Sequence, residues 1–168
     1  MLFIVGIDPG LKGGIAFYTP TSLTAHRTPT VEVPYVKKGK KTTRFNMDLN
    51  ECRVMLDRGN ITHVFLEKVS AMPGQGVTGM FRFGQNLGQW EGIIVGLGLE
   101  YTLVTPQVWK RKAGLIKADK GDSVILARKT WPEHADTFKY KTADEGRAEA
   151  SLIAQYGWNH LSQKYPQP

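Results

Sequence analysis

Residues 2–10 have the sequence LFIVGIDPG, an apolar run that ends in the turn-forming triplet Asp8-Pro9-Gly10. A second apolar run, GGIAFY, follows at residues 13–18. Two β-prone runs separated by a short break of proline and glycine are typical of antiparallel strands joined by a turn. We therefore predict an N-terminal β-hairpin, with the carboxylate of Asp8 at the end of its first strand.

Beyond this hairpin, strand-like and helix-like segments alternate along the chain. Residues 61–67 (ITHVFLE) have strand composition and end in a second carboxylate, Glu67. The other predicted elements are a strand near residues 30–36, an exposed loop at 37–44, a strand at 99–104, and helices at 46–58, 77–99, 106–112, 121–130 and 145–156, the last ending at Gly157. This order predicts a mixed α/β sheet with helical cover, in one domain spanning residues 1–168.

The composition is that of a folded globular protein with a polyanionic partner. Of the 168 residues, 41% are hydrophobic and 22% are charged, and the formal net charge of +7 favours nucleic acid. The single cysteine, Cys52, cannot pair within the chain, which favours a reducing, intracellular (cytoplasmic) setting. The N-terminal run lacks the basic start of a signal peptide, and no apolar run approaches the ~18 residues of a membrane span. We therefore expect no membrane association.

Four carboxylates lie where a sheet and a helix could bring them together. Asp8 and Glu67 each end a strand, the position at which a sheet presents side chains to a cleft. Glu145 and Glu149 lie about 40° apart on the face of the last predicted helix, at ~100° per residue. Asp144 lies about 140° from Glu149 by the same arithmetic and fits better as the N-cap of that helix.

Such a group of carboxylates is typical of a metal-dependent nuclease. The four negative charges repel one another unless cations neutralise them, and Mg²⁺ or Mn²⁺ prefers oxygen-only sites. Two ions ~3.5–4 Å apart activate water and stabilise the leaving oxygen in phosphodiester hydrolysis. The alternatives are ordinary structural roles: a turn at Asp8, an ion pair between Glu67 and Lys68, and first-turn acids that complement the helix dipole.

Basic residues gather in two regions, for which we predict contact with the DNA backbone. The predicted DNA-binding residues are Lys37, Lys38, Lys40, Lys41, Arg44, Arg82, Lys110, Arg111, Lys112 and Lys120. The alternative for these residues is a solvated helix face or loop. Trp109 either stacks on a base or belongs to the core. The four histidines share no spacing, and we interpret them as structural or surface residues rather than zinc ligands.

The predicted helix at 77–99 is unusually rich in glycine, at positions 79, 84, 88, 92, 96 and 98. A glycine in a helix interior costs up to ~1 kcal/mol, so these positions require an explanation. Close approach to the sheet, to a partner subunit or to a DNA backbone would each supply one.

These segments, in this order, resemble the RuvC-like Holliday junction resolvases of the ribonuclease H-like superfamily. The resemblance rests on residues 6–10 (GIDPG) with 13–16 (GGIA), on 65–67 (FLE) and on 146–154 (GRAEASLIA). Two further segments, residues 80–88 (MFRFGQNLG) and 106–110 (PQVWK), look like the phage and plant-organelle branch of this family. The similarity covers nearly the whole chain.

The resemblance implies a fold, an activity and a partner. The fold is ribonuclease H-like, a five-stranded mixed β-sheet flanked by α-helices. The activity is that of a homodimeric, Mg²⁺-dependent endonuclease in DNA recombination and repair, with Mn²⁺ as a substitute and no small-molecule cofactor. The family cuts two strands of like polarity in a four-way junction, leaving 5′-phosphate and 3′-hydroxyl nicks. The branch implies a phage source acting in the host cell, or an organelle.

Carried over by position, the resemblance also implies the site residues. Asp8, Glu67 and Glu149 would be catalytic metal ligands. The family often has aspartate where this chain has Glu145, and RuvC itself spaces its last pair i, i+3, which falls here on a glycine. Helix geometry favours Glu145 as the fourth ligand, with Asp144 as the alternative.

Two further positions follow from the resemblance. Lys120 is similar to the family lysine that supports the scissile phosphate. The aromatic wedge of RuvC falls on Ser70, so that Phe81 or Phe83 would have to open the strands. The alternative functions are a ribonuclease H-like nuclease on RNA–DNA hybrids or branched forks, and a non-catalytic junction-binding module.

Overall fold

The predicted N-terminal hairpin lies at the centre of the main sheet in the computed structural model, which describes residues 1–71, 74 and 76–164. Strand β1 (Ile4–Asp8) pairs antiparallel with β2 (Gly14–Thr19). The backbone N–H of Gly13 donates to the carbonyl of Gly10 at 2.9 Å and closes the turn between them. The prediction of this hairpin, with Asp8 at its strand end, is therefore confirmed.

The main sheet has five strands in the order β3-β2-β1-β6-β7. Strand β3 (Ser22–Arg27) is antiparallel to β2, whereas β6 (His63–Glu67) is parallel to both β1 and β7 (Tyr101–Val104). The mixed sheet predicted from the order of elements is therefore confirmed, with the five strands that the resemblance implies. Because β1 and β6 run parallel and in register, their carboxyl ends place Asp8 beside Glu67.

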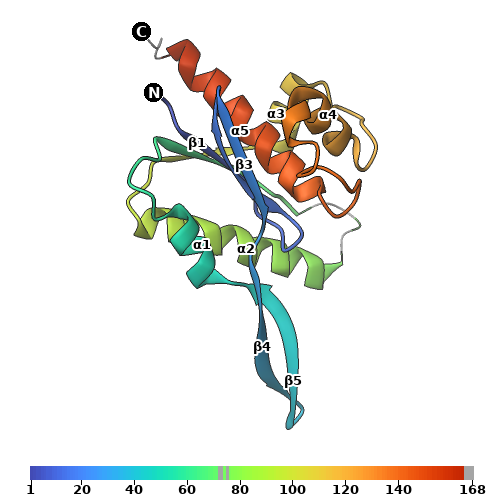
Figure 1. Ribbon diagram of the computed structural model, residues 1–168. Coiled ribbons are helices and arrows are strands. Elements are labelled where there is room, and N and C mark those ends of the chain that lie inside the picture. Colours follow the sequence, from blue (N-terminus) through green and yellow to red (C-terminus); the bar gives the residue numbers. More distant parts are fainter. Residues whose placement is uncertain (72–73, 75, 165–168) are drawn as a thin grey trace.

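Helices cover both faces of this sheet (Figure 1). One face is covered by α1 (Leu49–Leu56) and α2 (Val77–Gly96). The other is covered by α3 (Pro106–Ala113), α4 (Asp122–Thr130), the short 3₁₀ helix η1 (Pro132–His134) and α5 (Glu145–Lys164). None of the helices in the described ranges combines the length and hydropathy needed to cross a membrane.

Two apolar layers fix α5 and α2 against the sheet. Phe65, Trp109 and Ile153 belong to the layer under α5, and Trp90 and Ile94 to the layer under α2. Helix α5 lies so close to β1 that a Cβ at Gly6 would overlap the backbone of α5 at Ala150 and Ala154. A Cβ at Gly146 would likewise overlap the backbone of Gly13. These contacts set the start of α5 directly beside the end of β1.

Residues 30–47 differ from the prediction. The expected strand near 30–36 does not join the main sheet, and the expected loop at 37–44 is not a loop. Strands β4 (Thr30–Lys37) and β5 (Lys40–Met47) form a separate two-stranded sheet, which projects away from both termini in Figure 1. Lys38 and Gly39 both have positive φ, which a tight two-residue hairpin turn requires. The third strand beside β2 is β3 instead, which the sequence analysis missed.

Two glycine interpretations are also corrected. Helix α5 continues past Gly157 to Lys164, because this glycine makes room for the ring of Phe65 and does not end the helix. On α2, a Cβ at Gly84, Gly88 or Gly92 would meet nothing within 4 Å. Packing against the sheet therefore does not explain the glycines of α2.

Candidate active site

The four carboxylates named from the sequence line one cavity of about 540 Å³. Asp8 comes from the end of β1, Glu67 from the end of β6, and Glu145 and Glu149 from the first turns of α5. Lys120 lines the same cavity, from the loop before α4. The structure thus brings together residues that are more than 140 positions apart in the sequence, as the strand ends and the helix spacing predict.

Asp8 and Glu67 each accept a hydrogen bond from within the protein. The Oδ1 of Asp8 accepts a long hydrogen bond, 3.4 Å, from the backbone N–H of Gly10. Glu67 is only 6% exposed, and its Oε1 accepts a hydrogen bond of 2.8 Å from Trp109 Nε1. Trp109 is fully buried, so the structure places it in the core and not in a position to stack on a base.

The two acids of α5 are positioned by α3 and by the start of α4. Glu149 Oε1 accepts from Ser123 Oγ at 3.1 Å and forms an ion pair with Lys110 Nζ at 3.0 Å. Glu145 Oε1 accepts from the backbone N–H of Gly121 at 2.9 Å. Each carboxylate therefore has a fixed neighbour before any ligand binds.

Burial and neighbouring charges raise the pKa values of the two strand-end carboxylates. Burial, followed by the charges of Glu67 and Glu149, raises the pKa of Asp8 well above its ordinary value. Burial also raises the pKa of Glu67 to about 7, with Glu149 adding to the shift and the Trp109 hydrogen bond opposing it. Burial alone would lower the pKa of Lys110, but Glu149 and then the other two acids outweigh it and raise the pKa. Lys110 therefore supplies positive charge to a cluster of partly buried acids.

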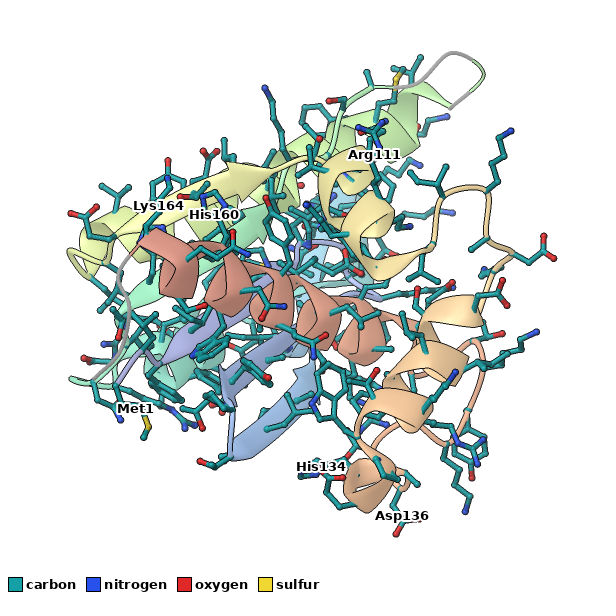
Figure 2. The ribbon with its side chains drawn as sticks, turned by 90° about the horizontal axis from the view of Figure 1, so that it is seen from above. Met1, Arg111, His134, Asp136, His160 and Lys164 are labelled. Carbon is teal, nitrogen blue, oxygen red and sulfur yellow. The ribbon has the colours of Figure 1, made fainter. Side chains whose placement is uncertain are left out.

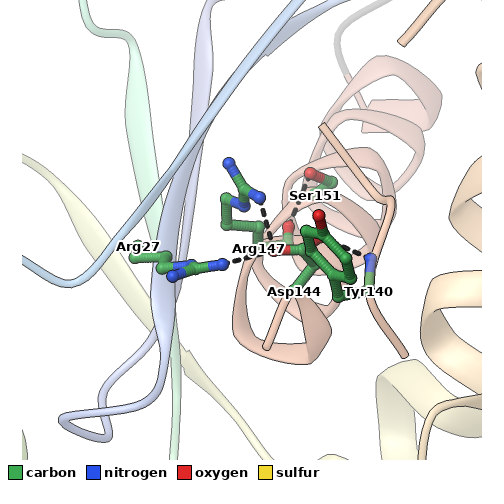
Figure 3. A network of polar contacts seen from close by, with 5 residues as sticks. All are labelled: Arg27, Tyr140, Asp144, Arg147 and Ser151. Carbon is green, nitrogen blue, oxygen red and sulfur yellow. Dashed lines mark hydrogen bonds and ion pairs between the residues drawn. The ribbon is translucent and has the colours of Figure 1, made fainter. Parts of the chain in front are cut away.

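Asp144 lies outside this cavity lining, in a separate network (Figure 3). It is fully buried and accepts from Arg27 Nη2 at 2.9 Å, from Arg147, and from the backbone N–H of Tyr140 at 2.7 Å. Burial opposes ionisation, but these donors outweigh it and lower the pKa of Asp144. The expected capping bond to a helix N–H is replaced by the bond from Tyr140. As an alternative ligand to Glu145, Asp144 is disfavoured because its oxygens are already engaged by the two arginines.

The chemistry of the donor set fits a hard divalent cation. The cavity is lined by four carboxylates, whose oxygens are the ligands that Mg²⁺ and Mn²⁺ prefer, and by three cations, Lys12, Arg82 and Lys120. Within the described residues, no three His, Cys, Asp or Glu side chains are gathered as ligands of one ion. Glu149 is paired with Lys110 instead, so an ion in this cavity would require the carboxylates to turn toward it.

The predicted basic residues divide into three groups. Lys120 and Arg82 line the cavity, and Lys110 is paired with Glu149 beside it. Arg111 and Lys112 are exposed on α3, and Figure 2 shows Arg111 on one side of α5 with His134 and Asp136 on the other. The remaining predicted cations lie on the β4–β5 hairpin or in its turn: Lys37, Lys38, Lys40, Lys41 and Arg44.

Sequence reasoning missed four residues that shape the cavity. Trp109 positions Glu67, and Ser123 positions Glu149. Lys110 was expected to contact a DNA phosphate, but in the structure it pairs with the carboxylate of Glu149. Asn86 of α2 is 7% exposed and lines the cavity opposite α5. A polar residue on the buried stripe of α2 was the available signal for Asn86. The other three depend on how α3 and α4 pack, which no local pattern reveals.

The fold is that of the RuvC resolvases, and the ribonuclease H-like α/β class is confirmed. Thermus thermophilus RuvC in complex with a Holliday junction substrate superposes with a TM-score of 0.60, 11% identity and 96% coverage of both chains. A second structure of Thermus thermophilus RuvC gives a TM-score of 0.59 at 12% identity, covering 96% of this chain and 97% of that one.

A sequence relative is the chloroplastic Holliday junction resolvase MOC1 of Chlamydomonas reinhardtii. It is 30% identical over 93 residues, which are 55% of this chain. The matched part covers only 10% of MOC1, so the chain spans about a tenth of that relative's length. No protein-family model matches the chain.

Proposed function

We propose that this protein is a structure-selective DNA endonuclease that resolves four-way junctions. The observation that carries the proposal is the convergence of Asp8, Glu67, Glu145 and Glu149 on one cavity of a RuvC-type fold. The net charge of +7 supports it, because a basic protein with an acidic pocket suits a polyanionic substrate cut by a metal-dependent site. The names of the RuvC structure and of MOC1 support the junction as the substrate.

The proposed metal ligands are the four cavity carboxylates, holding two Mg²⁺ ions, with Mn²⁺ as a substitute. When bound, such ions supply a water of lowered pKa and positive charge for the leaving oxygen. The residues of the chain orient the scissile phosphate. Lys120, on the cavity wall, is proposed to contact it, and the phosphodiester bond is cut to leave a 5′-phosphate and a 3′-hydroxyl.

Arg82 and the exposed Arg111 and Lys112 are proposed to hold the DNA backbone near the cavity. Phe83 lines the cavity at 40% exposure, whereas Phe81 lies outside the cavity lining at 72% exposure, so Phe83 is the better placed of the two to act on an opened base pair. Ser70, also in the lining, is too small to wedge between bases.

We further propose a homodimer, because two symmetric cuts in a junction require two active sites. The open glycine face of α2 supports this proposal. Gly84, Gly88, Gly92 and Gly96 recur every fourth residue, and a Cβ on any of them would meet nothing within 4 Å. The exposed Val95 adds apolar area to this helix. We also propose that the chain forms a single domain. We propose an intracellular setting for it, either in a phage-infected host cell or in an organelle.

The test is cleavage of a labelled four-way junction beside a matched linear duplex and an RNA–DNA hybrid, in Mg²⁺, Mn²⁺ or EDTA. Metal-dependent paired nicks on the junction alone are expected. Preferential loss of the RNA strand of the hybrid would move the protein to the ribonuclease H type. Tight junction binding without cutting in either metal would make it a binding module, with Lys110 as the permanent neutraliser of the acids.

A further inference from the structure

The β4–β5 hairpin is a regular two-stranded ribbon whose two faces differ in charge. Each strand has eight residues, so the ribbon extends about 26 Å at ~3.3 Å per residue. Directly paired residues on antiparallel strands share a face, and successive pairs alternate between faces. The register Thr30↔Met47 to Lys37↔Lys40 therefore assigns every residue of the ribbon to one face or the other.

One face, which we call the cationic face, carries these cross-strand pairs: Val31–Asn46, Val33–Arg44, Tyr35–Thr42 and Lys37–Lys40. Among these eight residues, all of them described by the structure, three are cations and none is an acid. The guanidinium carbon of Arg44 lies 5.6 Å from the centre of the Tyr35 ring, so an aromatic surface and a cation are presented side by side.

The opposite face, which we call the mixed face, carries the other four pairs: Thr30–Met47, Glu32–Phe45, Pro34–Thr43 and Val36–Lys41. Its one cation, Lys41, is offset by Glu32, whose carboxylate accepts a hydrogen bond from Thr43 Oγ1. The sequence run of basic residues at 37–44 is therefore unequally divided, with Lys40 and Lys41 pointing to opposite sides of the ribbon.

The base of the hairpin is tied to the turn that follows Asp8. Thr28 is buried, its N–H donates to the carbonyl of Gly13 at 3.1 Å, and its Oγ1 donates to the carbonyl of Gly10 at 2.9 Å. Both glycines line the cavity. On the other strand, the N–H of Asp48 donates to the carbonyl of Pro29 at 2.9 Å. The ribbon is thus anchored at the edge of the candidate active site and extends away from it (Figure 1).

We propose that the cationic face binds the phosphates of a duplex arm of the DNA whose scissile strand enters the cavity. This inference rests on the proposed function, and it adds a second contact that is remote from the cut. Charge complementarity favours polyphosphate over a second copy of the chain, because two cationic faces would repel each other. A two-stranded ribbon is also narrow enough to enter the major groove, where phosphates line both walls.

The test compares Lys40→Ala with Lys41→Ala in the full-length protein. The two variants remove the same charge from adjacent residues on opposite faces, so their net charge is identical. Binding to a linear duplex and to a four-way junction is measured without metal, over a range of salt concentrations, which makes the readout independent of cleavage. Circular dichroism and thermal unfolding check that both variants are folded.

Lys40→Ala is expected to weaken binding about five- to tenfold at 0.1 M salt and to reduce the slope of log K against log[salt] by about 0.9. Lys41→Ala is expected to bind as the wild type does, because Lys41 lies on the mixed face, and this proposal removes it from the DNA-binding residues predicted from the sequence. The triple variant with alanine at Lys37, Lys40 and Arg44 is expected to reduce the same slope by about three times that amount.

Equal losses in the two single variants, or no loss in either, would overturn the proposal. So would a triple variant that binds normally but sediments with a changed mass, because the face would then be a subunit contact. Failure of the proposed function gives a different result: the wild type binds DNA but cuts no junction in Mg²⁺ or Mn²⁺, while the comparison of Lys40 with Lys41 still decides the role of the ribbon.

Discussion

Lys110 Nζ lies 3.0 Å from Glu149 Oε1, beside a cluster whose other acids include Asp8 and Glu67. Lys110 is the residue that α3 contributes to the charge balance of the cavity. It occupies one oxygen of a proposed metal ligand, so ion binding and the Lys110 ion pair compete for Glu149. We therefore expect the stability of the protein to depend on divalent cations.

Lys110→Ala is expected to lower the free energy of unfolding of the metal-free protein by about 1–2 kcal/mol at pH 8, because partly buried carboxylates lose their cation. Saturating Mg²⁺ is expected to close most of this gap by replacing the lost charge. Thermal unfolding with and without Mg²⁺ measures both effects. Arg111→Ala, on the exposed side of the same helix, serves as the control and stays within ~0.5 kcal/mol of the wild type. A metal-free Lys110→Ala protein as stable as the wild type would contradict this account.

Glu67 makes the metal-free protein less stable as pH rises. Its pKa is raised from 4.5 to about 7, so between these values the folded state binds more protons than the unfolded state. The contribution of Glu67 to the free energy of unfolding therefore decreases between about pH 4.5 and pH 7. Above pH 7 the full destabilisation is reached.

Glu67→Gln removes that cost while the Trp109 Nε1 hydrogen bond retains an acceptor. We expect it to raise the free energy of unfolding at pH 8 by about 1–3 kcal/mol, and to change it little at pH 5. Paired thermal or urea unfolding at the two pH values measures the difference. An equal effect at both values would show that ionisation of Glu67 carries no such cost.

Asp144 and Glu145 are adjacent, but the structure predicts opposite consequences for replacing them. Asp144→Asn removes the buried charge that holds Arg27 and Arg147, so it is expected to destabilise the fold by about 2–4 kcal/mol. The cleavage rate of the folded fraction is expected to stay close to that of the wild type. The pKa of Asp144 is lowered, so its stabilising effect is present at neutral pH and is lost as the carboxyl is protonated in acid.

Glu145→Gln keeps an acceptor for the N–H of Gly121 and is expected to stay within ~1 kcal/mol of wild-type stability. It is expected to slow metal-dependent cleavage about 100-fold or more. Replacing even a residue that only hydrogen-bonds to a metal ligand typically lowers metal affinity or activity 10–100-fold. Urea unfolding and single-turnover cleavage of both variants test this division. A stable but inactive Asp144→Asn protein would reverse the assignment of the fourth ligand.

The sequence predicted the centre of the fold and the carboxylates because both depend on local patterns. Asp8 and Glu67 end apolar strands, and the i, i+4 spacing of Glu145 and Glu149 needs nothing beyond helix geometry. Strand β3 was missed because only Leu23 of its six residues is buried, which leaves little hydrophobic pattern.

The hairpin and the Asp144 network were missed for different reasons. The turn residues Lys38 and Gly39 lack the asparagine or aspartate that usually marks a hairpin, and the basic run around them resembles a solvated loop. Asp144 is at the position of a helix cap, and its real partner Arg27 lies on a strand 117 residues away in sequence. Long-range pairs of this kind depend on how α5 packs against the sheet.

The most direct test of the central claim is to map the products of single-turnover cleavage on a four-way junction labelled in turn on each strand. With Mg²⁺, the wild type is predicted to nick two strands of like polarity at symmetric positions. Glu149→Gln is predicted to still bind the junction, but to cut at both positions about 100-fold more slowly or worse. Cleavage that persists in EDTA, that is equal on linear duplex, or that is unchanged in Glu149→Gln would contradict a metal-dependent junction resolvase built on these carboxylates.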